Sequence, residues 1–473
     1  MYDVMIIGAG VVGGMIAREL SRFEISVLIV EKESDVAMGA TRANSGIVHA
    51  GFDAKVGSLK AKLNVRGSEM MEDVCQRLGV KYKRNGSMVI GFGEEDERVL
   101  CELLARGEAN GVNGLSLLSG DGARAIEPAL SENVTAALLA ESGGIVCPYE
   151  LCVAAIGNAM DNGVELMTDF QVTKIDMDGD CYTVYSGKRS VRARYLINSA
   201  GLYSDEMASL LGITDFKVTP RRGEYMLLDK ACGGLISHTI FRTPTKMGKG
   251  ILISPTVDGN ILLGPTSVDI GDKESRATTN DGIQKIIREA RENVPKIDTG
   301  MVITSFSGLR STGNTGDFII RRDGRAIHLI GIESPGLTAS VAIGEYVLDM
   351  LRDTSLLKKK KDHFIDKRRP MHRFRAASIE EKNEIIKSDP SYGKIVCRCE
   401  SISEGEIIEA IRTNPKPRDL DGVKRRTRAQ MGRCQGGFCS PTVAELLAKE
   451  LKIPMEEVTK FGGGSKIVVV KTK

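Results

Sequence analysis

The sequence predicts an α/β protein with a discontinuous Rossmann-like domain, an antiparallel-sheet domain and a small helical C-terminal domain that carries a cysteine cluster. Three observations lead to this class. The first thirty residues read as strand, Gly-rich turn, helix and strand. Residues 217–305 alternate short apolar runs with turn residues, which is typical of an antiparallel sheet. Four of the ten cysteines gather after residue 391.

The Gly-rich turn has the spacing of a dinucleotide-binding loop. Gly8 permits a tight turn after the first apolar strand, Gly10 allows backbone to approach a pyrophosphate, and Gly13 lets the helix pack on the strand. The helix start offers N–H groups and a positive dipole end to phosphates. Glu31 follows the second strand, Val27–Val30, where a carboxylate can accept a ribose hydroxyl.

The overall composition excludes several classes of protein. A chain of 473 residues with 42% hydrophobic residues supports two or three globular domains with large cores. The net charge of +3 gives no general attraction for nucleic acid. No apolar run approaches the roughly 20 residues that span a bilayer, and the N-terminus does not resemble a signal peptide. Scattered cysteines without secretory features indicate a reducing compartment.

Further segments are predicted to return to the same ligand. The small, polar stretch 41–51 forms a loop after the second strand. Strand 195–199 ends at Ala200-Gly201 before a helix, and a buried strand at 326–332 leads through Glu333–Thr338 into a helix at 339–352. Helices are also expected at 59–78, 94–111, 149–162, 281–292, 403–413 and 442–451, and a strand at 81–92.

A set of short motifs resembles the FAD-dependent glycerol-3-phosphate dehydrogenases and oxidases, within the D-amino-acid-oxidase-like flavoenzymes. The similarity covers residues 1–352, and L-2-hydroxyglutarate oxidases are close cousins. The motifs are the Gly8 turn, Asn44-Ser45-Gly46 with His49, Arg222–Tyr225, Gly248-Lys249-Gly250, Ser307–Arg310 and Ser334–Thr338.

The resemblance implies that FAD accepts a hydride from a carbon that bears a hydroxyl group. His49 would be the base, Lys249 and Arg310 would hold a substrate with its phosphate, and Ser334 would lie near the flavin ring. These residue types suit the chemistry, because imidazole accepts a proton near neutral pH and phosphate is bound well by Arg and Lys. The residues expected to bind FAD are Gly8, Gly10, Gly13, Glu31, Lys32, Thr41, Arg42, Asn44, Ser45, Gly46, Ala200, Gly201, Gly336, Leu337 and Thr338.

The tail has the cysteine pattern C-x-C, thirty-four residues, C-x₄-C, formed by Cys397, Cys399, Cys434 and Cys439. Four thiolates on two Gly-containing loops suit a 2Fe–2S cluster, and a structural zinc ion is the alternative. The segment resembles bacterioferritin-associated-ferredoxin-like domains, which also end the large subunits of anaerobic glycerol-3-phosphate dehydrogenases.

The expected domains are an FAD-binding domain (1–80, 140–216 and 306–357), a substrate-binding cap (81–139 and 217–305), a solvated basic linker (358–390) and a 2Fe–2S domain (391–473).

The leading function is oxidation of sn-glycerol 3-phosphate to dihydroxyacetone phosphate, with electrons passed through the cluster to an acceptor protein or subunit. The alternatives are an L-2-hydroxyglutarate or 2-hydroxy-acid dehydrogenase and a non-catalytic protein that docks a partner through its tail. The expected location is the cytoplasm, with peripheral membrane association through a partner.

Overall fold

The computed structural model describes residues 1–244 and 250–470, and most of its strands belong to two sheets. The first sheet has eight strands, and β1 lies between β2 and β12 with both pairings parallel. The residues of β1 and β2 are nearly all buried. Strands buried on both faces have continuous apolar runs, as these two do. The strands are β1 (Tyr2–Ile7), β2 (Val27–Val30), β9 (Glu165–Met167), β10 (Lys174–Asp178), β11 (Cys181–Ser186), β12 (Arg189–Asn198), β19 (Ile319–Asp323) and β20 (Ala326–Ile330).

The helices of this domain pack on one face of the first sheet and form one apolar core with it. They are α1 (Val11–Leu20), α2 (Leu59–Leu78), α5 (Pro148–Asp161) and α8 (Gly336–Met350). Gly67 of α2 lies so close to α8 that a Cβ atom there would be 2.1 Å from the carbonyl oxygen of Thr338. The short α6 (Ser204–Ser209) follows β12.

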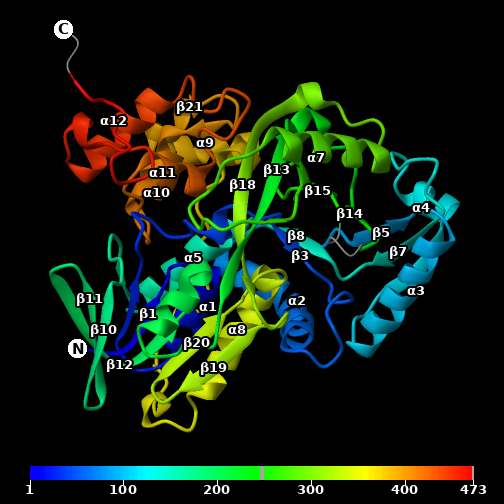
Figure 1. The fold of residues 1–473 in the computed structure, drawn as a ribbon. Coiled ribbons are helices and arrows are strands. Elements are labelled where there is room, and N and C mark those ends of the chain that lie inside the picture. The colour runs from blue at the N-terminus through cyan, green and yellow to red at the C-terminus, as the bar shows by residue number, and fades with distance from the viewer. Residues whose placement is uncertain (245–249, 471–473) are drawn as a thin grey trace.

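The second sheet has nine strands and is antiparallel except for the pairing of β14 with β5. The strands are β5 (Ser87–Gly91), β6 (Leu115–Ser119), β7 (Ala136–Ala140), β13 (Val218–Leu228), β14 (Thr239–Arg242), β15 (Leu252–Pro255), β16 (Ile261–Gly264), β17 (Val268–Asp269) and β18 (Val302–Gly313). The long β13 and β18 pair along almost their whole length and connect this sheet to the rest of the molecule (Figure 1). The helices α3 (Glu94–Ala109), α4 (Gly120–Ile126) and α7 (Asn280–Asn293) accompany it.

The C-terminal domain, drawn in orange and red in Figure 1, contacts α5. It contains β21 (Ile395–Cys397), β22 (Ile402–Ser403), α10 (Glu404–Arg412), α11 (Leu420–Thr427) and α12 (Ser440–Leu451), around its own apolar core. The helix α9 (Ile379–Ser388) precedes it. None of the described helices is long and apolar enough to cross a membrane.

The expected helices are confirmed: the helix at 59–78 has the expected bounds, and the ends of the others are shifted by at most three residues. The single strand expected at 81–92 is wrong, because a turn at Gly86 (φ +73°) divides it into β4 (Tyr82–Lys83) and β5. The strand β4 instead pairs with β8 (Gly144–Val146), which also pairs with β3 (Ile47–Val48). The helices α4 and α11 were not expected, because both are short and α11 has polar residues around most of its circumference.

The linker is solvated only in part. Lys358, Lys359 and Lys360 are exposed, in agreement with the expectation. In contrast, Arg368 inserts against α5 and pairs with Asp161 at 3.4 Å, and only 11% of its side chain is exposed. The middle part of the linker is therefore held against the protein, whereas α9 in its second half has no buried residue.

We predict that Gly67→Ala destabilises the protein by about 1–3 kcal/mol, because the added methyl group overpacks the α2–α8 contact. Equilibrium unfolding in urea measures this change. Gly271→Ala is the control, since a Cβ atom at Gly271 has no neighbour within 4 Å. Unchanged stability of Gly67→Ala would contradict the close approach of the two helices.

Candidate functional site

A cavity of about 780 Å³ lies where the carboxyl ends of the parallel strands of the first sheet meet the second sheet. Its volume is within the range of cofactor and ligand sites, about 300–1,000 Å³. It brings together most of the residues expected to bind the dinucleotide and the substrate. These are Gly8, Gly10, Glu31, Lys32, Thr41, Arg42, Asn44, Ser45, His49, Ala200, Gly201, Arg310, Ser334, Gly336 and Leu337.

The turn after β1 depends on two close backbone contacts. Gly8 has φ +106°, and a Cβ atom there would lie 2.6 Å from the Ser199 carbonyl oxygen. Gly13 does not line the cavity, but a Cβ atom on it would lie 2.2 Å from the Gly8 carbonyl oxygen. Glycines at these positions therefore allow α1 to start directly behind the turn, with its N-terminus toward the cavity.

Glu31 links the turn to the following loop. Its carboxylate accepts hydrogen bonds from the N–H of Ala9 at 2.8 Å and the N–H of Glu33 at 3.0 Å. Burial raises the pKa of Glu31, and these two N–H groups oppose that rise. Each carboxylate oxygen keeps a lone pair for a ligand hydroxyl, so the acid fits the expected ribose contact.

The loop 41–46 is held in shape by its own side chains. Thr41 Oγ1 accepts from the N–H of Val11 at 3.1 Å. Asn44 donates to the carbonyls of Ala40 and Thr41 and accepts from the N–H of Gly46. Gly46 has φ +66° and faces the Val146 carbonyl rather than the cavity.

Two cationic side chains that line the cavity, Lys32 and Arg42, differ in their contacts. Lys32 pairs with Glu274 at 3.1 Å and lies over the ring of Tyr203. Arg42 is half-buried, and burial together with the nearby Arg276 and Arg425 lowers its pKa. An anionic ligand such as a pyrophosphate would relieve that repulsion.

At the other end of the cavity, His49 lies between two hydroxyl groups. Its backbone N–H donates to Thr338 Oγ1 at 2.9 Å, and its Nε2 lies 3.4 Å from Ser334 Oγ. The ring also contacts Phe241, with 5.8 Å between the ring centroids. Thr338 is fully buried behind His49 and positions its backbone without lining the cavity.

Arg310 is presented by β18 and fixed by residues of the second sheet. Its Nη2 donates to the Thr266 carbonyl at 3.2 Å. Burial raises the pKa of Tyr225, and a hydrogen bond with Arg310 opposes this rise. Gly223 leaves space for the guanidinium group, since a Cβ atom there would lie 2.9 Å from Nη2. Lys249 lies outside the described residues.

Several lining residues were missed by sequence reasoning. Lys60 forms a half-buried ion pair with Glu333 at 2.8 Å, and Glu333 also accepts from Thr312 at 2.7 Å. Lys60 is the second residue of α2 and carries no local motif. Tyr225 belongs to the recognised Arg222–Tyr225 motif, and its link to Arg310 is set by the pairing of β13 with β18.

The four tail cysteines come together as two pairs. Cys397 hydrogen-bonds with Cys439, which lowers the pKa of Cys397 and raises that of Cys439. Cys399 hydrogen-bonds with Cys434. Burial opposes ionisation of Cys434, yet the N–H groups of Phe438, Gly436 and Gly437 lower its pKa. Backbone donors around paired thiols fit a binuclear iron–sulfur cluster, whose two irons each take two thiolates.

A close glycine contact is part of the cysteine site. Gly432 is required here, because a Cβ atom on it would lie 2.2 Å from that of Cys399. The arrangement of two thiol pairs fits the 2Fe–2S cluster, in which each iron takes two thiolates.

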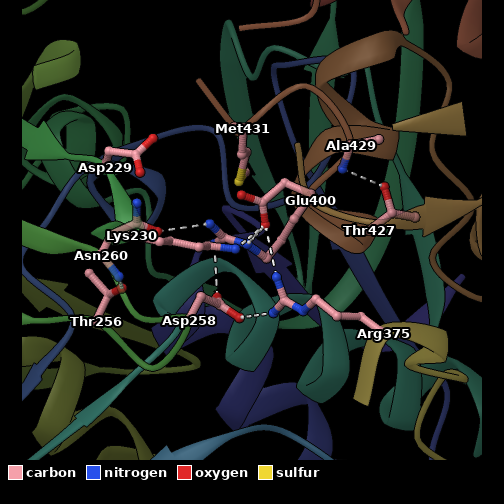
Figure 2. A network of polar contacts seen from close by, with 12 residues as sticks. Asp229, Lys230, Thr256, Asp258, Asn260, Arg375, Glu400, Thr427, Ala429 and Met431 are labelled. Atoms are coloured by element: carbon pink, nitrogen blue, oxygen red, sulfur yellow. Dashed lines mark hydrogen bonds and ion pairs between the residues drawn. The ribbon is translucent and has the colours of Figure 1, made fainter. Parts of the chain in front are cut away.

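Buried ion pairs join the cysteine domain to the second sheet (Figure 2). Glu400, which follows Cys399, accepts from Lys230 at 2.6 Å, Arg428 at 3.0 Å and Arg375 at 3.2 Å. Arg428 also pairs with Asp258 at 2.8 Å. Both carboxylates are almost completely buried, so the domain is docked by charges that water does not screen.

Comparison with known proteins agrees with this geometry. Residues 3–350 match the family model "FAD dependent oxidoreductase", and residues 395–449 match "BFD-like [2Fe-2S] binding domain". The chain thus belongs to the FAD-dependent oxidoreductases and carries a BFD-like 2Fe–2S domain at its C-terminal end.

Within this family, the chain is similar to several individual proteins of known name. A glycerol 3-phosphate dehydrogenase of Caloramator mitchellensis is 44% identical over 100% of this chain and 99% of its own. The FAD-bound structure of L-alpha-glycerophosphate oxidase from Mycoplasma pneumoniae superposes with a TM-score of 0.74 at 32% identity, over 78% of this chain and 98% of that one. A mitochondrial L-2-hydroxyglutarate dehydrogenase of Pongo abelii is 30% identical over 74% of this chain and 87% of its own.

We predict that Gly13→Ala loses most of its flavin on purification. The added methyl group costs about 1–3 kcal/mol by overpacking the turn. The flavin-free protein relieves this strain by moving the turn, whereas the FAD-bound protein retains it. FAD binding should therefore weaken by about 5- to 150-fold. Flavin absorbance per mole of protein measures the loss. Gly234→Ala, whose Cβ atom would meet no neighbour within 4 Å, is the control. Equal flavin content in both variants would show that the contact between α1 and the turn does not set FAD affinity.

Proposed function

We propose that this protein oxidises sn-glycerol 3-phosphate to dihydroxyacetone phosphate. The observation that carries the proposal is the single cavity in which a dinucleotide turn, His49 and Arg310 all meet. Bound FAD would supply the hydride acceptor of this reaction. The similarity to glycerol 3-phosphate dehydrogenase over the full chain supports this substrate.

In the proposed reaction His49 would take the hydroxyl proton of the secondary alcohol, and the bound cofactor would supply the acceptor for its C–H hydride, so that a ketone is left. Thr338 fixes the backbone of His49, and Ser334 contacts its Nε2, so one hydroxyl group holds the main chain and the other meets the imidazole. Arg310 would bind the phosphate through its guanidinium group, with Lys249 as a second cation. Tyr225 and Thr266 hold Arg310 in place.

The proposed FAD contacts follow from the cavity. The N-terminus of α1 and Arg42 would face the pyrophosphate, Glu31 the ribose, and Ala200-Gly201 and Gly336-Leu337 the remaining backbone surface. Three of the expected residues do not line the cavity and would act indirectly. Gly13 would fix the turn, Gly46 the loop 41–46, and Thr338 the backbone of His49.

L-2-hydroxyglutarate is the alternative substrate, because a dicarboxylate also binds cations. It has less support, since the L-2-hydroxyglutarate dehydrogenase of Pongo abelii is 30% identical over 74% of the chain, against 44% over the full chain for the glycerol 3-phosphate dehydrogenase. A non-catalytic docking protein has less support still, because it gives no reason for a fixed His49 in the same cavity as Arg310.

The cysteine domain is proposed to pass electrons to an acceptor protein or subunit. A 2Fe–2S cluster held by Cys397, Cys399, Cys434 and Cys439 would supply one-electron transfer. Cys399 is exposed, and Phe438, between two of the cysteines, is 81% exposed. This face is the proposed contact with the acceptor, and an acceptor in a membrane would place the protein at that surface.

An anaerobic titration tests the substrate. We expect glycerol 3-phosphate to bleach the flavin at low stoichiometry, and His49→Ala to slow bleaching by about 10²–10⁴-fold, the usual contribution of a general base. His363→Ala, at an exposed linker position, should bleach at the normal rate. Bleaching by L-2-hydroxyglutarate alone would reassign the substrate, and no bleaching by either would reject the dehydrogenase proposal.

A second prediction concerns the route by which electrons leave. Cys434→Ser should keep substrate-driven flavin bleaching but lose reduction of a protein acceptor, because a cluster ligand is missing. Stopped-flow measurements of the two half-reactions separate these steps, and Cys101→Ser, an exposed cysteine of α3, is the control. Normal acceptor reduction by folded Cys434→Ser would remove the cluster from the route.

A further inference from the structure

The loop after Glu31, residues 32–42, has two functional faces. Toward the cavity it presents Lys32, Met38, Thr41 and Arg42. It is joined to the Gly-rich turn by a hydrogen bond from the N–H of Ala37 to the Ala9 carbonyl at 2.9 Å. We call residues 32–42 the flavin loop, because its cavity face covers the proposed dinucleotide site.

The other face of the flavin loop carries a buried carboxylate whose cations come from the cysteine domain. Asp35 is 2% exposed and receives a two-pronged contact from Arg426, with both nitrogen–oxygen distances 2.8 Å. Arg425 adds a third contact at 2.5 Å. Both arginines are themselves almost completely buried.

A neighbouring contact fixes the same face. Ser34 donates to the buried Asp419 at 2.6 Å, and Asp419 also caps α11 by accepting from the N–H of Gly422. Burial alone would raise the pKa of Asp35, but Arg426 and Arg425 outweigh burial and lower it to about 2. The carboxylate is therefore charged at neutral pH and needs its arginines.

The helix α11 connects this contact to the cysteines. Arg425 and Arg426 lie in its last turn. Two residues after Arg426, Arg428 (φ +70°) pairs with Glu400, which is labelled in Figure 2. Glu400 directly follows Cys399 in the chain. A few residues of continuous structure thus link the flavin loop to the cysteine pairs.

We propose that Asp35, Arg425 and Arg426 are positioning residues for FAD, so that the docked cysteine domain holds the flavin loop in its binding shape. The inference rests on FAD occupying the cavity, as in the proposed function, but it does not depend on the substrate. Removing one partner would leave buried charge unpaired and move the loop. By linkage, FAD binding would strengthen docking of the cysteine domain by the same factor.

This dependence distinguishes the chain from its shorter structural relative. The glycerophosphate oxidase structure matches 78% of this chain and binds FAD. The FAD-binding fold therefore does not itself require a cysteine domain. In the present chain the flavin loop bears a buried carboxylate, and the arginines that pair with it belong to the tail.

The test compares two full-length variants that each remove one arginine from the contact between the domains. Arg426→Gln removes the two-pronged contact with Asp35. Arg418→Gln removes an exposed contact with Asp169 of 2.9 Å, which is the matched control because exposed pairs contribute little. FAD release is followed by the fluorescence of free flavin after dilution, and hydrogen exchange reports the protection of residues 32–42.

We expect Arg426→Gln and Asp35→Asn to bind FAD about 5- to 150-fold more weakly, the usual range for coupling between sites. Exchange of the flavin loop should rise in both, and Arg418→Gln should match the wild type. If Arg426→Gln does not fold, Arg426→Lys replaces it, because it keeps the charge but loses the two-pronged contact. Weakened FAD binding with faster loop exchange in that variant supports the proposal.

Wild-type FAD retention and loop protection in the folded Asp35 or Arg426 variants would overturn the inference. An equal loss in Arg418→Gln would also overturn it, since general docking rather than Asp35 would then be responsible. These outcomes are independent of the substrate. A wild-type protein that holds FAD but is not bleached by glycerol 3-phosphate refutes the proposed function alone.

Discussion

The site depends on the parallel pairing of β12 with β1 on one side and β20 on the other. Carboxyl ends of parallel strands meet at one edge of a sheet, so three segments far apart in sequence end beside one cavity. The spacing is close enough that Gly8 lies under the Ser199 carbonyl. A side chain at this contact would separate the turn from β12 and leave the three segments without a common edge.

The second sheet adds a further positive charge to the lining of the cavity, at a defined place. Arg310 lies on β18, opposite Arg221 of β13, and is held by Tyr225 and the Thr266 carbonyl. A guanidinium group with few fixed contacts would lose much side-chain entropy on binding a ligand. The long β13–β18 pair makes this loss smaller by orienting the group before the ligand arrives.

Charge also sets how the cysteine domain is attached. Asp35, Asp258 and Glu400 are all buried and paired with arginines or lysines from other parts of the chain. Buried pairs add little net stability compared with apolar contacts, but they are costly to break on one side. Such contacts favour one docking arrangement over others. A fixed arrangement of the flavin relative to the cluster would require this.

The sequence by itself determined the elements whose signals are local. The spacing of Gly8, Gly10 and Gly13, the strand before them and Glu31 after them define a dinucleotide turn, and C-x-C with C-x₄-C defines a thiolate site. Helices with long apolar periodicity were likewise predictable. The division of 81–92 into β4 and β5 was not, since it follows from the partners that each piece finds.

Only the tertiary structure decided the roles that depend on pairing between distant segments. Lys60, Tyr225 and Thr266 enter the site through strand register and helix packing, and Asp35 looks like an ordinary loop acid until α11 is placed against it. Local sequence encodes backbone conformation through sterics and periodicity. The partner of such a buried charge is fixed by the three-dimensional arrangement, because ion pairs between distant segments, unlike i,i+4 pairs within a helix, have no fixed sequence spacing.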